Sequence, residues 1–228
     1  MSRTRLTIAA LAAVGMTASF AGAQTDDAAR PATKPGKPAA AQPEQPAGMP
    51  SPEEMQKMME AATPGPMHAH LMKAVGTWDG KVKHWMDRNA PPQESTCVSV
   101  FSSVMDGRYL KCEIQGDMAG MPFKGLGYYG YDNAAKQFQS TWIDNLGTGI
   151  MVGTGELSPD KKTMTWTMTY HCPIQNKPCT MREVERYVNE NTVVLEMWTT
   201  HPEDGKDFKM MEITSTRRAA RAGADAAR

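Results

Sequence analysis

The sequence predicts an all-β protein: a single ten-stranded antiparallel up-and-down barrel preceded by a short helical segment. From Thr77 onward, apolar and polar residues alternate with a period of two, the pattern of strands that bury one face. Turn sequences such as Asp106-Gly107 separate these runs, so consecutive strands must be antiparallel neighbours. An open sheet would leave two unpaired edges, and a two-sheet sandwich would need a long crossover that the sequence lacks. Closure into a barrel is therefore favoured over the sandwich.

The chain begins with an export signal. Arg3 and Arg5 precede an uncharged apolar run, Leu6 to Phe20, and Ala21-Gly22-Ala23 offers the small residues of a cleavage site. The run has 15 residues, whereas a membrane-spanning helix needs about 20. We therefore expect residues 1–23 to be a signal peptide. The mature protein is expected to be periplasmic or extracellular, with no membrane span.

Residues 24–66 are expected to form a disordered linker rich in Pro and Ala, because such a composition cannot bury enough apolar surface to fold. Within it, Ser51-Pro52-Glu53-Glu54 combines an N-cap, a first-turn proline and acidic residues, and predicts a short helix over 53–62. A second short helix follows from Met67 to about Val75. The barrel domain is expected over 67–217, and a flexible tail over 218–228.

Each strand of the expected barrel has one apolar face. The clearest is 163–170, where threonines alternate with Met164, Trp166, Met168 and Tyr170, so that the threonines should face solvent. By the same pattern and the turn sequences, we expect strands at 77–86, 94–104, 108–115, 121–131, 137–144, 149–157, 163–170, 180–188, 192–200 and 208–217.

The start of the barrel resembles that of known calycin barrels, which include lipocalins, fatty-acid-binding proteins and nitrobindins. Gly76-Thr77-Trp78 is similar to their Gly-x-Trp opening. The resemblance implies that Trp78 closes one end of the barrel and that Arg217 or Arg218, at the end of the last strand, covers it.

A longer ordered set of segments resembles the uncharacterised bacterial family called domain of unknown function 1579 (DUF1579), over about 67–217. This family has no established activity, so the resemblance implies the calycin-like fold and no particular reaction. The segments are Val75-Gly76-Thr77-Trp78, Gly120-Met121-Pro122-Phe123-Lys124-Gly125, Gly130-Tyr131-Asp132-Asn133, Ser140-Thr141-Trp142-Ile143-Asp144, Thr148-Gly149-Ile150-Met151, Arg182-Glu183-Val184 and Met211-Glu212-Ile213-Thr214.

A barrel of this size can enclose one small hydrophobic or amphipathic molecule, and binding such a ligand is the function we expect. The residues expected to bind it lie on the apolar faces: Trp78, His84, Tyr129, Trp142, Asp144, Trp166, Glu183 and Arg217. Other interior positions are Phe123, Met151, Met168, Leu195 and Met197.

Two of these interior residues are acidic. Asp144 and Glu183 could bind a ligand or act as an acid–base pair, which keeps an isomerase or hydrolase as an alternative. For Asp144 we favour a structural role, as the partner of an interior Arg or of backbone N–H groups near a turn. With no nucleophile beside an evident base and no catalytic motif, we assign no catalytic residue and prefer binding.

Copper binding is a second alternative. Thioethers and imidazoles suit Cu(I), and Met55, Met58, Met59, Met67, His68 and His70 crowd the segment before the barrel. The counter-argument is that Met is as frequent within the strands, where it fills gaps in the core. We therefore expect no metal site and no cofactor. Because the 25 basic and 25 acidic residues balance, we expect no nucleic-acid partner either.

The four cysteines of an exported protein should be oxidised. A hairpin centred on Gln175-Asn176 places Cys172 opposite Cys179, and we expect a disulfide between them. The rival is a metal site formed by the two cysteines with His171. Cys97 and Cys112 are the remaining pair, but a two-residue turn sets Cys112 opposite Phe101, so a bridge between them would need a wider loop or a bulge.

The same hairpin register carries over to the acidic residues further along the strand. With Cys172 opposite Cys179, Met168 would oppose Glu183 and Trp166 would oppose Glu185. Both carboxylates would then share the interior face with the Met-Trp row.

Overall fold

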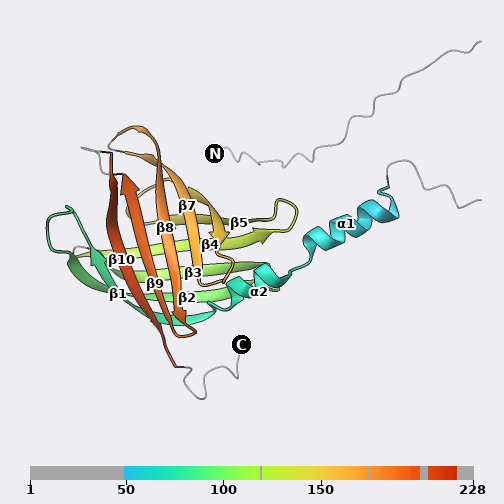
Figure 1. Cartoon of the computed structure of the whole chain (residues 1–228), viewed down its shortest axis with the longest axis horizontal. Helices are drawn as coiled ribbons and strands as arrows, with labels where there is room; N and C mark the ends of the chain where they lie inside the picture. The colour runs from blue at the N-terminus through green and yellow to red at the C-terminus, as the bar shows by residue number, and fades with distance from the viewer. Residues whose placement is uncertain (1–48, 119, 174, 201–204, 220–228) are drawn as a thin grey trace, which may run out of the picture. The chain divides into compact units, whose positions relative to one another are not determined.

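The ten strands form one closed antiparallel barrel in which β1 pairs with β10 and every other pair is consecutive in the chain (Figure 1). The structure is a computed structural model that describes residues 49–118, 120–173, 175–200 and 205–219. The expected signal peptide, residues 24–48 of the linker and the last nine residues of the tail lie outside the described residues. The expected barrel is confirmed, and the two-sheet alternative is wrong.

The elements lie close to the positions that the alternation predicts. They are α1 (Pro52–Ala62), α2 (Pro66–Met72), β1 (Gly76–His84), β2 (Gln93–Val104), β3 (Tyr109–Met118), β4 (Met121–Asp132), β5 (Gln137–Asp144), β6 (Met151–Leu157), β7 (Thr163–Cys172), β8 (Lys177–Asn189), β9 (Thr192–Thr200) and β10 (Asp207–Arg217).

Helix α1 is held at both ends by hydrogen bonds. At its start, the Ser51 hydroxyl accepts from the Glu54 N–H at 3.2 Å, and the Glu54 carboxylate accepts from the Ser51 N–H at 2.7 Å. At its end, the Asn133 amide donates to the carbonyls of Glu60, Ala61 and Thr63. No side chain of α1 is buried, so these caps compensate for the missing packing.

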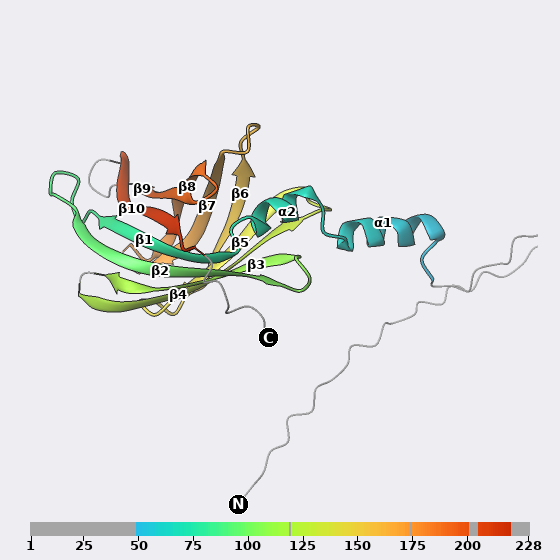
Figure 2. The same ribbon diagram turned by 90° about the horizontal axis from the view of Figure 1, so that it is seen from below.

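Helix α2 closes one end of the barrel, where it packs against β3 and β4 (Figure 2). Its Leu71 is buried in a cluster with Leu110, Phe138 and Met164. Because odd-numbered strands begin at this end and even-numbered strands finish there, we call it the helix end and the opposite one the far end.

Trp78 and Arg217 complete the closure, as the calycin resemblance implies. The guanidinium carbon of Arg217 lies 4.1 Å from the centre of the Trp78 ring, within the range of a cation–π contact. Arg217 also donates to the carbonyls of Lys73, Val75 and Glu190, and the Trp78 indole donates to the Ala74 carbonyl. These bonds tie the chain before β1 to the end of β10.

Gly76, at the start of β1, is required by this arrangement. It has a φ of 136°, and a Cβ atom there would lie 2.8 Å from an Arg217 nitrogen. Inside the barrel, glycines make room for aromatic side chains: a Cβ on Gly125 would lie 2.2 Å from the Trp142 ring, and one on Gly155 would lie 2.6 Å from the Trp166 ring. The large residues of β5 and β7 thus lie over the bare backbone of neighbouring strands.

The hairpin of β7 and β8 differs from the expected register by two residues. Cys172 pairs with Lys177 and Tyr170 with Cys179, so the hairpin is centred one residue earlier in the chain than expected, and Asn176, just before β8, adopts the left-handed conformation at φ 48°. The two cysteines are diagonal neighbours, and the expected Cys172–Cys179 disulfide is not formed. None of the four cysteines, all at described positions, is in a disulfide. Cys112 does lie opposite Phe101, as a simple turn predicts.

The two-residue difference in register changes the cross-strand partners of β8 but not the face of the sheet on which each of its side chains lies. Trp166 faces Glu183 rather than Glu185, and Met168 faces Met181. A shift of two residues keeps every side chain of β8 on its expected side of the sheet, because successive residues of a strand alternate between the two faces.

Trp78→Ala should lower the free energy of unfolding by about 3 to 5 kcal/mol, the cost of truncating a buried Trp, and should release Arg217. The matched control is Trp85→Ala. Trp85 follows β1 directly, its ring is partly exposed, and the Lys209 ammonium lies 5.1 Å from the ring centre. We expect it to lose about 1 kcal/mol. Urea unfolding measures both, and equal losses would show that Trp78 does not hold the barrel end.

Candidate functional site

All eight residues expected to contact a ligand lie on the interior face of the barrel. Register partners on neighbouring strands share one face of the sheet, as Trp166 does with Glu183 and Trp78 with Arg217. Alternation along each strand then assigns the remaining side chains to the interior or the outer face. Trp78 and Arg217 lie at the helix end. His84 and Asp144, which end β1 and β5, lie at the far end, and Tyr129, Trp166 and Glu183 lie between.

Two neighbouring acids, Glu183 and Glu185, lie inside the barrel on β8. Glu185 accepts hydrogen bonds from the Trp166 indole at 3.2 Å and from the Tyr187 hydroxyl at 3.1 Å. Glu183 has no hydrogen-bond or ion-pair partner among the described residues, and its side chain stays partly accessible. It is the unsatisfied member of the pair.

Burial dominates the electrostatics of this pair. It raises the pKa of Glu183 to about 8, and the neighbouring Glu185 carboxylate raises it further in the same direction. Burial also raises the pKa of Glu185, although the hydrogen bonds from Tyr187 and Trp166 oppose this by stabilising the carboxylate. Glu183 therefore carries a proton at neutral pH when nothing is bound.

Three further titratable groups lie close to the acids. Tyr129 from β4 and Cys112 from β3 both feel the charges of Glu183 and Glu185, and Tyr187 donates to Glu185. Burial raises the pKa of the Cys112 thiol to about 12, so this group is a poor nucleophile. The Tyr129 ring lies 5.4 Å from the Trp166 ring, between centroids. We call Cys112, Tyr129, Trp166, Glu183, Glu185 and Tyr187 the acid cluster.

Asp144 does not belong to the acid cluster. Its carboxylate accepts from the Trp142 indole at 3.0 Å and from the Leu146 N–H at 2.9 Å, in the turn after β5. The charge that acts on Glu183 is that of Glu185. The structure thus gives Asp144 the structural bonds that the sequence offered as an alternative, and it does not bring Asp144 and Glu183 together as an acid–base pair.

The Met- and His-rich segment does not assemble into one ligand set. Met55, Met58 and Met59 of α1 are exposed, whereas His68 is buried and accepts from the Gly65 N–H at 3.0 Å. His70 packs edge-on against Tyr187, with 5.4 Å between ring centres. Across the described part of the chain, no three His, Cys, Asp or Glu side chains are grouped to hold a metal ion.

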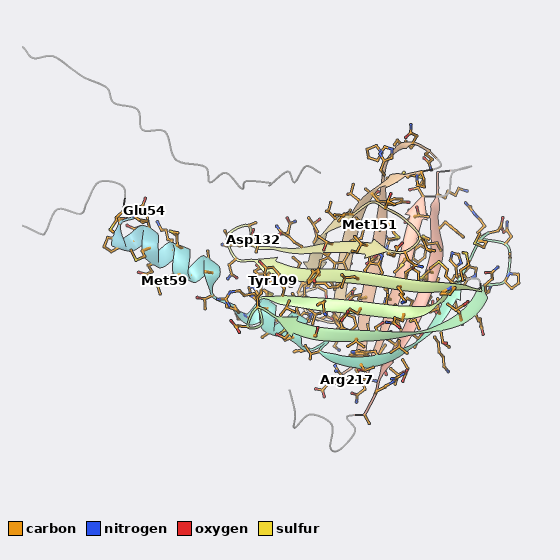
Figure 3. The ribbon with its side chains drawn as sticks, turned by 180° about the vertical axis from the view of Figure 1, so that it is seen from behind. Glu54, Met59, Tyr109, Asp132, Met151 and Arg217 are labelled. Atoms are coloured by element: carbon orange, nitrogen blue, oxygen red, sulfur yellow. The ribbon has the colours of Figure 1, made fainter. Side chains whose placement is uncertain are left out.

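A groove on the outer wall was not foreseen. It has a volume of about 780 Å³ and is lined mainly by outward-facing side chains of β3 to β7, including Tyr109, Tyr128 and Val152. Residues of α1 and α2 and the inward-facing Tyr129 and Ser140 also contribute to the lining. Tyr109 and Asp132, which belong to its rim, lie at the same end of the barrel (Figure 3). Most of its walls are threonines and tyrosines that the alternation assigns to solvent, and such residues carry no signal of a binding site in the sequence.

Glu185 was also missing from the expected ligand contacts. Its position on the interior face was apparent from the alternation. Its role depends on the Trp166 and Tyr187 donors, and that arrangement follows from the register of β7 and β8, which the turn sequence did not reveal.

The fold and the acid cluster define a closed ten-stranded barrel that holds a cluster of acidic and aromatic side chains inside. The chain belongs to DUF1579, a family of proteins of unknown function, whose model matches residues 63–217. No curated protein matches it. Among the described residues, no helix is both long and apolar enough to cross a membrane.

Solved structures also resemble the chain, among them the two that follow. One is Rv2717c from M. tuberculosis, with 15% identity and a TM-score of 0.50, covering 69% of this chain and 100% of that one. The other is the S-type phycobiliprotein lyase CPES from Guillardia theta, with 10% identity and a TM-score of 0.49, covering 72% of this chain and 98% of that one. The likeness to Rv2717c concerns the fold alone.

Proposed function

We propose that the protein binds a small hydrophobic or amphipathic molecule inside its barrel. The supporting observation is that interior side chains in the middle of the strands keep accessible surface, although the sheet is closed around them and α2 covers one end. A side chain inside a closed sheet stays accessible only if it borders a space that holds at least a water molecule. The side chains concerned are Ile114, Tyr129, Trp142, Glu183, Leu195 and Met197.

The composition of this interior suits a ligand of mixed character. Most of the accessible side chains are aliphatic or aromatic, and Glu183 adds one polar group without a partner. Small-molecule sites commonly combine apolar walls with a few polar groups that orient the ligand. Near the helix end, by contrast, Met164 and Trp166 have at most 1% of their surface exposed, so the space lies away from that end.

Catalysis by Asp144 and Glu183 is not favoured by the geometry. Asp144 is held by Trp142 and the turn after β5, apart from the acid cluster. The thiol of Cys112 beside Glu183 is held in its protonated form by burial. A reaction would need a nucleophile or an acid–base pair with split roles around one position, and these residues supply neither.

Filling the interior should abolish binding. Wild-type protein should enhance the fluorescence of N-phenyl-1-naphthylamine, which is apolar and uncharged at pH 7. Met197→Trp, beside Glu183, should weaken this binding about tenfold or more, because the larger ring occupies the space.

Val152→Trp is the matched control. Val152 is 54% exposed and lines the outer groove, so this variant should bind the probe like the wild type. Loss of binding in Val152→Trp with retention in Met197→Trp would place the ligand in the outer groove. No binding by any of the three proteins would overturn the proposed function.

We also propose that the protein works outside the cytoplasm. The support is the sequence of residues 1–23, with its basic start, uncharged apolar run and small residues before Gln24. N-terminal sequencing of the mature protein should begin at Gln24. A mature product that still begins at Met1 would contradict export through this signal.

A further inference from the structure

We propose that the ligand is an amphipathic organic cation whose charged nitrogen binds Glu183 inside the barrel. This inference rests on the proposed function and adds the chemical class of the ligand. It follows from an imbalance: the acid cluster contains two carboxyl groups, and no described cationic side chain faces them.

Among the described residues, the interior faces of the strands hold three basic residues, and none of them faces the acids. Arg217 is at the helix end, stacked on Trp78 and donating to three carbonyls. His84 is at the end of β1, and burial lowers its pKa, so its ring is neutral near pH 7. Lys177, the exposed first residue of β8, lies at the far end. From α2, His70 packs against Tyr187, and burial lowers its pKa, so its ring is also neutral near pH 7.

Around Glu183 the side chains of the neighbouring strands are Trp166 and Met197, and the titratable groups nearby are Glu185, Tyr129, Tyr187 and Cys112. None of these is a cation.

Another buried acid of this protein, on the outer face, does form ion pairs with basic side chains. Glu196, on the outer face of β9, is only 9% exposed, and its carboxylate contacts Arg186 at 2.8 Å and Lys209 at 3.3 Å. These contacts hold its pKa below the usual range. A buried acid without such a partner is costly, because its charge loses water and gains nothing in return. Glu183 is therefore unlike a structural acid.

The surroundings of Glu183 fit an organic cation better than a metal ion. Hard metal ions take oxygen ligands, and the side chains opposite Glu183 on the neighbouring strands, Trp166 and Met197, offer none. Aromatic rings attract cations, and the rings of Tyr129 and Trp166 lie 5.4 Å apart beside the acids. The accessible side chains of Ile114, Leu195 and Met197 can contact an apolar tail. Glu185 is already satisfied by Trp166 and Tyr187, which leaves Glu183 to receive the ligand.

Binding of a cation must release a proton at neutral pH. Without ligand, Glu183 is protonated up to a pH of about 8. An alkylammonium ion then exchanges with this proton: the carboxylic acid becomes a carboxylate, one proton leaves to the solvent, and the ammonium supplies the balancing charge. Affinity for a permanently charged cation should therefore rise with pH up to about 8 and level off above it.

A series of ligands that share one tail tests this inference. Decylamine, decan-1-ol and decanoate compete with N-phenyl-1-naphthylamine for wild-type protein at pH 7. We expect decylamine to bind about tenfold more tightly than decan-1-ol, the gain of a hydrogen bond to a charged group, and decanoate to bind most weakly. Calorimetry in buffers of different ionisation enthalpy should show proton release with decylamine and none with decan-1-ol.

The variant Glu183→Gln tests whether this residue causes the preference for decylamine over decan-1-ol. It should reduce the affinity for decylamine to that for decan-1-ol and leave decan-1-ol unchanged, whereas Glu156→Gln on the exposed face of β6 should change neither. If decan-1-ol or decanoate binds wild-type protein as tightly as decylamine, the inference is wrong while the proposed function stands. If neither the probe nor any decyl compound binds, the proposed function fails first. The ligand series on wild-type protein decides the matter even if Glu183→Gln does not fold.

Discussion

The pairing of β1 with β10 is the contact on which the rest of the molecule depends. It joins the two ends of the sheet over seven residue pairs, from Trp78 with Arg217 to His84 with Met211. Closure turns two faces of a sheet into an inside and an outside, so that no strand edge remains open. The Arg217 side chain secures this seam by bonding to the chain before β1 and stacking on Trp78. A side chain that points inward then loses bulk water, which is what gives Glu183 its unusual chemistry.

Much of the fold could be predicted from the sequence because a strand with one buried face leaves a period of two. The Thr and Met-Trp rows of β7 show this most clearly, and Trp166 and Met168 are indeed buried. The register of β7 and β8 could not be predicted, because it depends on how many residues the loop uses. The hairpin is centred one residue earlier in the chain than expected, with Asn176 in a left-handed conformation just before β8, and this places Cys172 opposite Lys177 instead of Cys179. Alternation specifies faces, whereas loop geometry specifies partners.

The candidate site was predicted in part for the same reason. Glu183 was placed inside by alternation together with the expected hairpin register, and the placement holds because the observed register differs by two residues rather than by one. Its relation to Asp144 required three-dimensional information, since the two residues lie on strands three apart in the barrel order. The hydrogen bonds from Trp166 and Tyr187 that satisfy Glu185, and leave Glu183 without a partner, could not be seen in a linear pattern. The outer groove has no sequence signal because threonine and tyrosine are ordinary residues of a solvent-facing strand.

Together these features describe a barrel that uses cations to neutralise Glu196, a buried acid of its outer face, and leaves the interior acid Glu183 without a cation. The protonation state of Glu183 in the unliganded protein tests this most directly. Carbon-detected NMR on protein labelled at the glutamate carboxyl carbons, with Glu183→Gln for assignment, follows each carboxyl group through pH. One resonance, absent from the variant, should titrate near pH 8. If the Glu183 resonance instead titrates near pH 4.3, as an ordinary exposed glutamate does, the carboxyl group is solvated or paired and the barrel interior holds no uncompensated acid.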